Sequence, residues 1–146
     1  MRPANHARRV NMLELRHLAV RCRDLDKART FYEKGLGFSW VDYRPEGISM
    51  DLSDGHVNLT LLPFETQPAP PHEEGDEHIH FGVYVESLEP IFKRLTDIGA
   101  HIVKEDVKKR FDYDRDTVPI GSFKVLDPDG NVVDITERPT EWRTSS

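Results

Sequence analysis

A repeat of about 63 residues is the feature that most constrains how this 146-residue chain can fold. An alternating stretch that contains His17 is followed, seven residues after that histidine, by Asp24, and His80 precedes Ser87 by the same seven residues. Asp24 and Ser87 are both good helix N-caps, and each precedes a segment with helical spacing of apolar residues. Repeats of this length indicate two copies of one supersecondary unit. We therefore predict an α+β fold of two tandem βαβββ units that form a curved mixed sheet.

Period-two alternation of apolar and polar residues predicts the strands of both units. The expected strands are 13–22, 39–44, 47–54 and 56–63, and then 78–85, 100–106, 121–127 and 131–137. The expected helices are 23–38, ended by Gly35 and Gly37, and 88–99. The predicted organisation is a flexible N-terminal arm (1–12), the first unit (13–63), an acidic, proline-rich linker (64–77), the second unit (78–137) and a C-terminal tail (138–146), with a mobile polar loop at 110–119.

Charge and composition exclude several classes of function. The net charge of −6 argues against a nucleic-acid-binding protein, which usually has a basic surface. The sequence has no apolar run of the length that spans a bilayer and no apolar core of a signal peptide. The single cysteine, Cys22, cannot form an internal disulfide or a cysteine-based zinc site. A reducing cytoplasm is the location that fits this composition best.

Four predicted strands pair an apolar face with a face that carries a few polar groups. If the apolar faces pack under the helices, the polar faces must line a cleft. A cleft with several histidines and a carboxylate is typical of a metal site. The polar groups expected there are His17 and Arg21; His56, Asn58 and Thr60; His78, His80 and Tyr84; and Asp134 and Thr136.

Three blocks of the sequence resemble the vicinal oxygen chelate superfamily: HLAVRCRDLDKARTFYEKGLGF, HIHFGVYVESLEPIFKRLTDIGA and DPDGNVVDITE. That superfamily includes glyoxalase I, extradiol ring-cleaving dioxygenases, fosfomycin-resistance transferases, methylmalonyl-CoA epimerases and bleomycin-sequestering proteins. The resemblance covers about 13–137. It is specific for the fold and much less specific for the reaction.

The resemblance implies metal ligands on the first and last strand of each unit. Carried over by position, these are His17, Asn58, His80 and Asp134. Glyoxalase I and the epimerases have a carboxylate where this chain has Asn58, so the resemblance to those two enzymes is weaker; His56 is a lesser alternative at that place. Two histidines and Asp134 remain, a set that holds one face of Fe or Mn, with Zn, Ni or Co also possible.

Two alternatives to this ligand set stay open. His78 lies on the same face as His80, two residues earlier, and only the seven-residue spacing to Ser87 favours His80. Glu137 is a second carboxylate near Asp134, but strand parity puts it on the opposite face.

Two further groups are expected to act on the substrate. Tyr84 and Arg21 share the polar face with the candidate ligands, so we predict that they orient substrate oxygens as catalytic residues. The basic run 108–110 is a weaker candidate for attracting an anion, because such runs are most often solvated surface.

The leading interpretation is a metalloenzyme that acts on a small substrate through two adjacent oxygens, with a dioxygenase-like site of two histidines and one carboxylate. The alternatives are a glyoxalase-like lyase or isomerase, a fosfomycin-type transferase, and a metal-free drug-binding protein of the bleomycin-resistance kind. The resemblance also implies a homodimer in which His17 shares a metal with His80 and Asp134 of the partner subunit.

Overall fold

The computed structural model describes residues 13–64, 77, 79–103 and 118–144. The predicted N-terminal arm, most of the predicted linker and most of the predicted loop at 110–119 lie outside these ranges. His78 and the basic run 108–110 also lie outside them.

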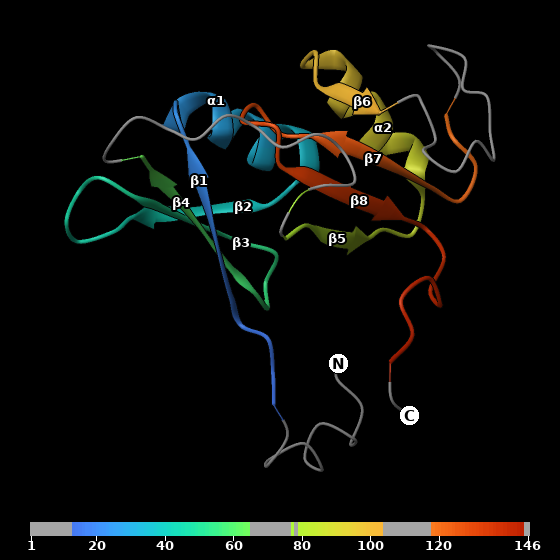
Figure 1. The fold of residues 1–146 in the computed structure, drawn as a ribbon, viewed down its shortest axis with the longest axis horizontal. Coiled ribbons are helices and arrows are strands. Elements are labelled where there is room, and N and C mark those ends of the chain that lie inside the picture. The colour runs from blue at the N-terminus through green and yellow to red at the C-terminus, as the bar shows by residue number, and fades with distance from the viewer. Residues whose placement is uncertain (1–12, 65–76, 78, 104–117, 145–146) are drawn as a thin grey trace.

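Each half of the chain forms one four-stranded sheet, and both sheets have the same strand order (Figure 1). The first half contains β1 (His17–Cys22), α1 (Leu25–Arg29), η2 (Thr30–Leu36), β2 (Ser39–Tyr43), β3 (Met50–Ser53) and β4 (Asn58–Pro63). The second contains β5 (Phe81–Tyr84), α2 (Leu88–Asp97), β6 (His101–Val103), β7 (Ser122–Leu126) and β8 (Val132–Thr136). The orders are β1-β4-β3-β2 and β5-β8-β7-β6. The predicted α+β fold of two βαβββ units is confirmed.

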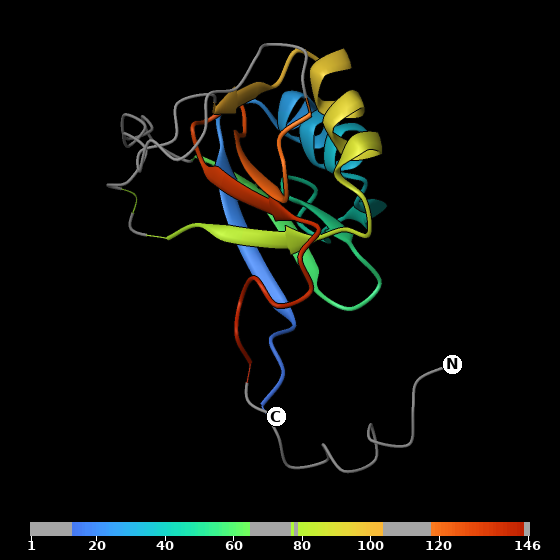
Figure 2. The ribbon, with the colours of Figure 1, turned by 90° about the vertical axis from the view of Figure 1, so that its right-hand side faces the viewer.

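Both sheets are mixed, because the first and last strands of each unit run parallel while the other neighbours are antiparallel. The helices gather on one side of the two sheets (Figure 2). One apolar core joins the helices to the sheet faces beneath them, and it includes Val20, Leu61, Leu95 and Ile135. We call the opposite side of each sheet its front face; it carries His17 in the first sheet. None of the helices in the described ranges is long and apolar enough to cross a membrane.

The two helices begin in different ways. Asp24 is the N-cap of α1, as predicted, and its carboxylate accepts a hydrogen bond from Lys27 N at 3.1 Å. Ser87 is the N-cap residue of α2, but its side chain makes no capping bond. Glu137 Oε2 accepts from Leu88 N at 2.9 Å instead. Glu137, the second carboxylate near Asp134, therefore caps the N-terminus of α2.

The two glycines at the end of the first helical segment have different roles. Gly37 has φ +100°, a left-handed conformation that suits glycine, and its N–H donates to Tyr32 O at 3.1 Å. Gly35 lies inside η2, so the prediction that it ends the helix is wrong. A Cβ there would lie 2.8 Å from Ile98 Cδ1 and 2.9 Å from Leu95 Cδ2. Gly35 therefore lets the helices of the two units approach closely.

A buried carboxylate ties the two units together. Asp127 follows β7 and accepts hydrogen bonds from the Tyr32 hydroxyl at 2.8 Å and from Asn131 Nδ2 at 2.8 Å. On the same turn, Asp129 Oδ1 accepts from Arg23 Nε at 3.0 Å. Burial raises the pKa of both Asp127 and the Tyr32 phenol.

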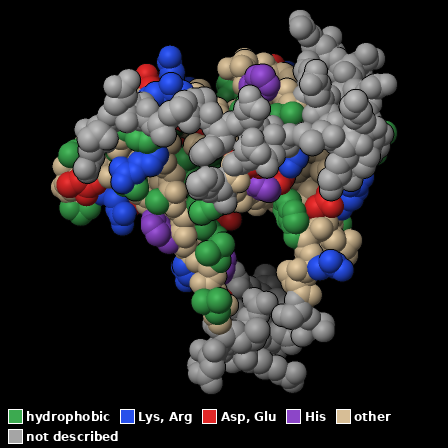
Figure 3. Space-filling model, in the orientation of Figure 1, with side chains coloured by type: hydrophobic (Ala, Val, Ile, Leu, Met, Phe, Trp, Pro, Cys, Tyr) green, Lys and Arg blue, Asp and Glu red, His purple; other side chains and the backbone are tan. Residues whose placement is uncertain are grey.

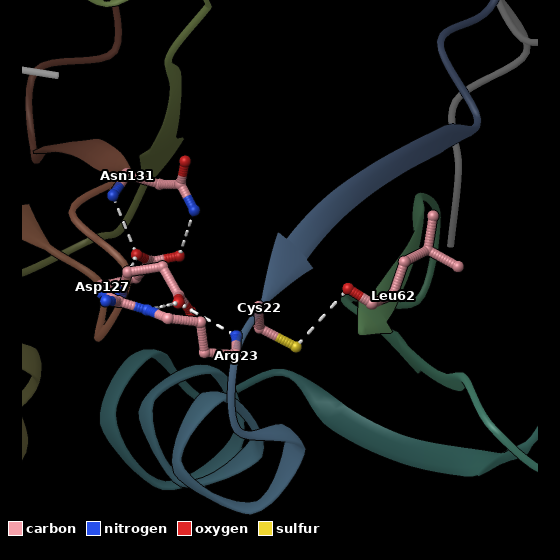
Figure 4. Close-up of polar contacts among 6 residues, drawn as sticks. Cys22, Arg23, Leu62, Asp127 and Asn131 are labelled. Atoms are coloured by element: carbon pink, nitrogen blue, oxygen red, sulfur yellow. Dashed lines mark hydrogen bonds and ion pairs between the residues drawn. The ribbon is translucent and has the colours of Figure 1, made fainter. Parts of the chain in front are cut away.

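Cys22 lies beside this turn and is buried, with its Sγ 3.7 Å from Leu62 O (Figure 4). Burial, with the nearby negative charges of Asp129 and Asp127, raises the pKa of its thiol to about 12. Because a thiolate is the form that attacks electrophiles and binds metals, Cys22 is a packing residue.

Tyr32→Phe is expected to lower the free energy of unfolding by about 1.5–3 kcal/mol, because it removes a hydrogen bond to a buried carboxylate. The folded pKa of Tyr32 exceeds its unfolded value of about 10. Its contribution is therefore complete below about pH 10 and is lost as the pH rises further. Urea unfolding at pH 7 and above pH 10 tests both points. Tyr32→Phe should lose less stability than wild type over the alkaline range; an equal loss would contradict this role.

Candidate metal centre

Two candidate ligands lie together at the front of the second sheet. His80 immediately precedes β5, and its Nε2 lies 3.0 Å from Asp134 Oδ2 on β8. The other ring nitrogen, Nδ1, lies 2.9 Å from Glu77 Oε1. The second oxygen of Asp134, Oδ1, accepts from Lys124 Nζ at 2.9 Å. Both side chains are therefore held in place by neighbours on the side away from their mutual contact.

The spacing of this pair fits a shared metal ion. Two ligand atoms bound at right angles to one ion, each about 2.1 Å from it, lie about 3 Å apart. The separation of His80 Nε2 and Asp134 Oδ2 is 3.0 Å. Both ring nitrogens of His80 face a carboxylate, so a metal bound at Nε2 would take the place of the contact with Asp134, while Glu77 would keep a proton on Nδ1.

The first sheet carries the equivalent histidine. His17 faces Asn58 across the parallel pair β1–β4, and its Nδ1 lies 2.5 Å from Asn58 Oδ1. The Thr60 hydroxyl lies 2.8 Å from the same oxygen and 2.7 Å from Asp51 Oδ1, so it can donate to either. An amide oxygen only accepts, so the proton of His17 belongs on Nδ1, which leaves the Nε2 lone pair as a potential metal ligand.

Asp51 gives this polar cluster a negative charge. Burial pushes the pKa of Asp51 upward, but hydrogen bonds from Asn58 and Thr60 and the positive charge of Arg44 outweigh it, so the pKa is lowered. Arg44 Nε lies 3.7 Å from Asp51 Oδ2. An ionised Asp51 that accepts from the Asn58 amide turns the oxygen of that amide toward His17.

The two half-sites remain separate within one chain. Asn58 and Asp134 each lie beside the histidine of their own unit, on different sheets. In the described ranges, no group of three or more His, Cys, Asp or Glu side chains is placed to hold one metal ion. Histidine side chains do reach the surface on the side of the molecule seen in Figure 3.

The two predicted catalytic residues occupy matching places in the repeat. Arg21 is four residues after His17, and Tyr84 is four residues after His80. Four residues of strand span about 13 Å, so each side chain lies well along the strand from the histidine of its own unit. Arg21 Nη1 donates to Pro63 O at 2.9 Å, whereas Tyr84 is 52% exposed.

A cavity of about 890 Å³ lies elsewhere, between α1 and the 127–130 turn. Its lining includes Arg23, Lys27 and His101, and it contains none of the predicted ligands or catalytic residues. The candidate ligands therefore lie outside this cavity, and the His80 side chain is 42% exposed.

Three polar partners of the candidate ligands were not predicted from the sequence. Asp51 and Lys124 alternate with buried apolar residues of β3 and β7, so the same parity argument could have placed them on the front face. Glu77 had no such signal, because it follows an irregular acidic stretch and its contact depends on how the chain enters β5.

Comparisons with known proteins agree with the fold and the repeat. The sequence matches the Glyoxalase/Bleomycin resistance protein/Dioxygenase superfamily over residues 14–135. It is 30% identical over 121 residues to the glutathione transferase FosA of Serratia marcescens, covering 83% of this chain and 78% of that protein. It is 28% identical over 130 residues to the glyoxalase domain-containing protein RDO1 of Mycosarcoma maydis, covering 88% of this chain and 70% of that protein.

Solved structures show the same architecture. The crystal structure of SMU.1112c superposes with a TM-score of 0.62 at 25% sequence identity, covering 87% of this chain and 100% of the other. Sequence match, strand order and superposition all lead to one assignment. The chain belongs to the Glyoxalase/Bleomycin resistance protein/Dioxygenase superfamily.

Proposed function

We propose that this protein is a metal-dependent enzyme of its superfamily that acts, in a dioxygenase-like manner, on a small substrate with two adjacent oxygens. The observation that carries the proposal is the contact of 3.0 Å between His80 Nε2 and Asp134 Oδ2, with His80 Nδ1 held by Glu77. His17, whose Nδ1 is held by Asn58 Oδ1, is the third proposed ligand.

A divalent ion at these residues would act as a Lewis acid and a template for the two substrate oxygens, and Fe or Mn would also permit chemistry with dioxygen. Each side chain has a defined task. With a metal at Nε2 of each histidine, Glu77 and Asn58 would hold the remaining imidazole proton on Nδ1. Lys124 holds Oδ1 of Asp134, so that carboxylate would offer a single oxygen. Arg21 and Tyr84 would bind the distal end of the substrate.

The proposed site includes two chains. His17 belongs to the first sheet and His80 with Asp134 to the second, and these half-sites are apart in the described part of one chain. A two-fold homodimer brings the first sheet of one subunit to the second sheet of its partner, so that two equivalent sites each receive all three ligands.

A metal-dependent transferase is the second candidate. The 30% identity to FosA, which is named a glutathione transferase, covers most of both chains. Both candidate reactions use a substrate that binds through its oxygens, so the metal centre alone does not separate them.

The reaction test compares the two candidates on one preparation. Protein purified without oxygen and loaded with Fe(II) or Mn(II) is given a panel of catechols while oxygen uptake is recorded. The same protein is then given glutathione and fosfomycin while loss of free thiol is recorded. Oxygen uptake that is absent in His80→Ala supports the dioxygenase-like function. Loss of free thiol without oxygen uptake would contradict the dioxygenase-like function and support the transferase function.

A further inference from the structure

A tryptophan from the C-terminal tail lies on the front face of the second sheet. Gly82 lies in β5 between Tyr84 and His80, which immediately precedes the strand, and its register partner on β8 is Asp134. A Cβ on Gly82 would overlap Cζ2 and Cη2 of Trp142. Only glycine leaves room for the indole there, so the six-membered ring of Trp142 lies against the strand beside the candidate metal ligands.

The tail is folded so that it returns to the sheet. After β8, Arg138 N donates to Thr136 Oγ1 at 3.0 Å, and Glu141 N donates to Arg138 O at 3.1 Å. Arg138 Nη1 also lies 3.5 Å from Glu141 Oε1. This turn reverses the chain and brings Trp142 back over β5. Trp142 is 44% exposed, so part of its ring system remains open to a ligand.

We propose that Trp142 is a specificity-determining residue that selects substrates whose two chelating oxygens are carried on an aromatic ring. The inference rests on the proposed metal centre at His80 and Asp134. A planar ring bound through adjacent oxygens would extend from the ion along the front of β5, where the indole offers an apolar surface of matching shape. Tyr84, 52% exposed at the next position on the same face, would extend this surface.

The test compares two chelators that differ in the ring. Catechol and oxalate each present two adjacent oxygens, but only catechol is aromatic. Their affinities are measured by calorimetry, without oxygen, on protein loaded with Mn(II). The background is Trp40→Phe, which leaves Trp142 as the only tryptophan, since the chain has two. Emission of Trp142 then reports directly on a ligand at its face.

Trp142→Ala is expected to lower the affinity for catechol about 10-fold, because an aromatic contact and its buried area are lost. The affinity for oxalate should change by less than about two-fold. Trp142→Phe should keep most of the catechol affinity. Gly82→Ala should reproduce the selective loss, because its methyl group displaces the indole. Catechol, but not oxalate, should quench the emission of Trp142.

Equal changes for the two chelators, or none, with Mn(II) still bound would overturn the role of Trp142 and leave the metal centre standing. Failure of the Trp40→Phe protein, and of wild type, to bind Mn(II) or Fe(II) would overturn the proposed function and this inference together. Metal content is therefore measured before either chelator is added.

Discussion

Asp134→Asn and His80→Ala are each expected to lower the affinity for a divalent metal by more than about 100-fold, the upper range for loss of a residue that only orients a ligand. Asp134 supplies the proposed charged ligand, and its neutral amide replacement attracts a cation far less. Both side chains lie at the front of the sheet, and neither belongs to the apolar core, so the fold should persist. Metal analysis and circular dichroism of each purified variant measure the two effects.

The matched control is Asn58→Ala. Asn58 touches His17 through its amide oxygen and is not among the three proposed ligands, so its loss should cost less metal than the loss of Asp134. His78→Ala should retain most of the metal. Similar losses of metal from Asn58→Ala and Asp134→Asn would indicate a four-ligand site. A loss of metal in His78→Ala but not in His80→Ala would show that His78, not His80, is the ligand.

A mixture of inactive His17→Ala and inactive Asp134→Asn protein is expected to regain metal binding and activity. If each site takes His17 from one subunit and His80 with Asp134 from the other, one of the two sites in every mixed dimer keeps all its ligands. Random exchange of equal amounts makes half of the dimers mixed, so about one quarter of the wild-type sites should return.

The control is either variant mixed with itself under the same exchange conditions. Exchange is verified with a tag on one variant. If exchange occurs without recovery, each site lies within one chain. A monomer in solution at the concentrations of the assay would contradict the dimer itself.

Alternation and the repeat were sufficient to predict the architecture from the sequence. The spacing of His17 to Asp24 and of His80 to Ser87 predicted two equivalent units, and the matching strand orders confirm them. Parity also placed Asp134 on the front face and Glu137 away from it, where it caps α2. These properties depend on residues that are close together in the sequence, which is why a single sequence was enough to predict them.

Contacts between distant segments could not be predicted in the same way. Ser87 has the right residue type for a cap, yet the bond to Leu88 N comes from Glu137, which is 49 residues after Leu88. Gly35 was expected to end the helix, because glycine is common at helix ends. Its actual role depends on the close approach of Leu95 and Ile98 from the other unit, which the sequence does not show. The contact of Trp142 with Gly82 could not be predicted either, because it depends on how the tail folds back over β5.

The metal content of freshly purified wild-type protein tests the central claim most directly. The account predicts about one divalent ion per chain after purification without oxygen, or after reloading with Fe(II) or Mn(II), since a two-fold dimer has one site per subunit. The His80→Ala variant, prepared in parallel, should contain almost none. Wild-type protein that holds no metal and takes up none on reloading would contradict the account, and it would favour a metal-free small-molecule-binding protein instead.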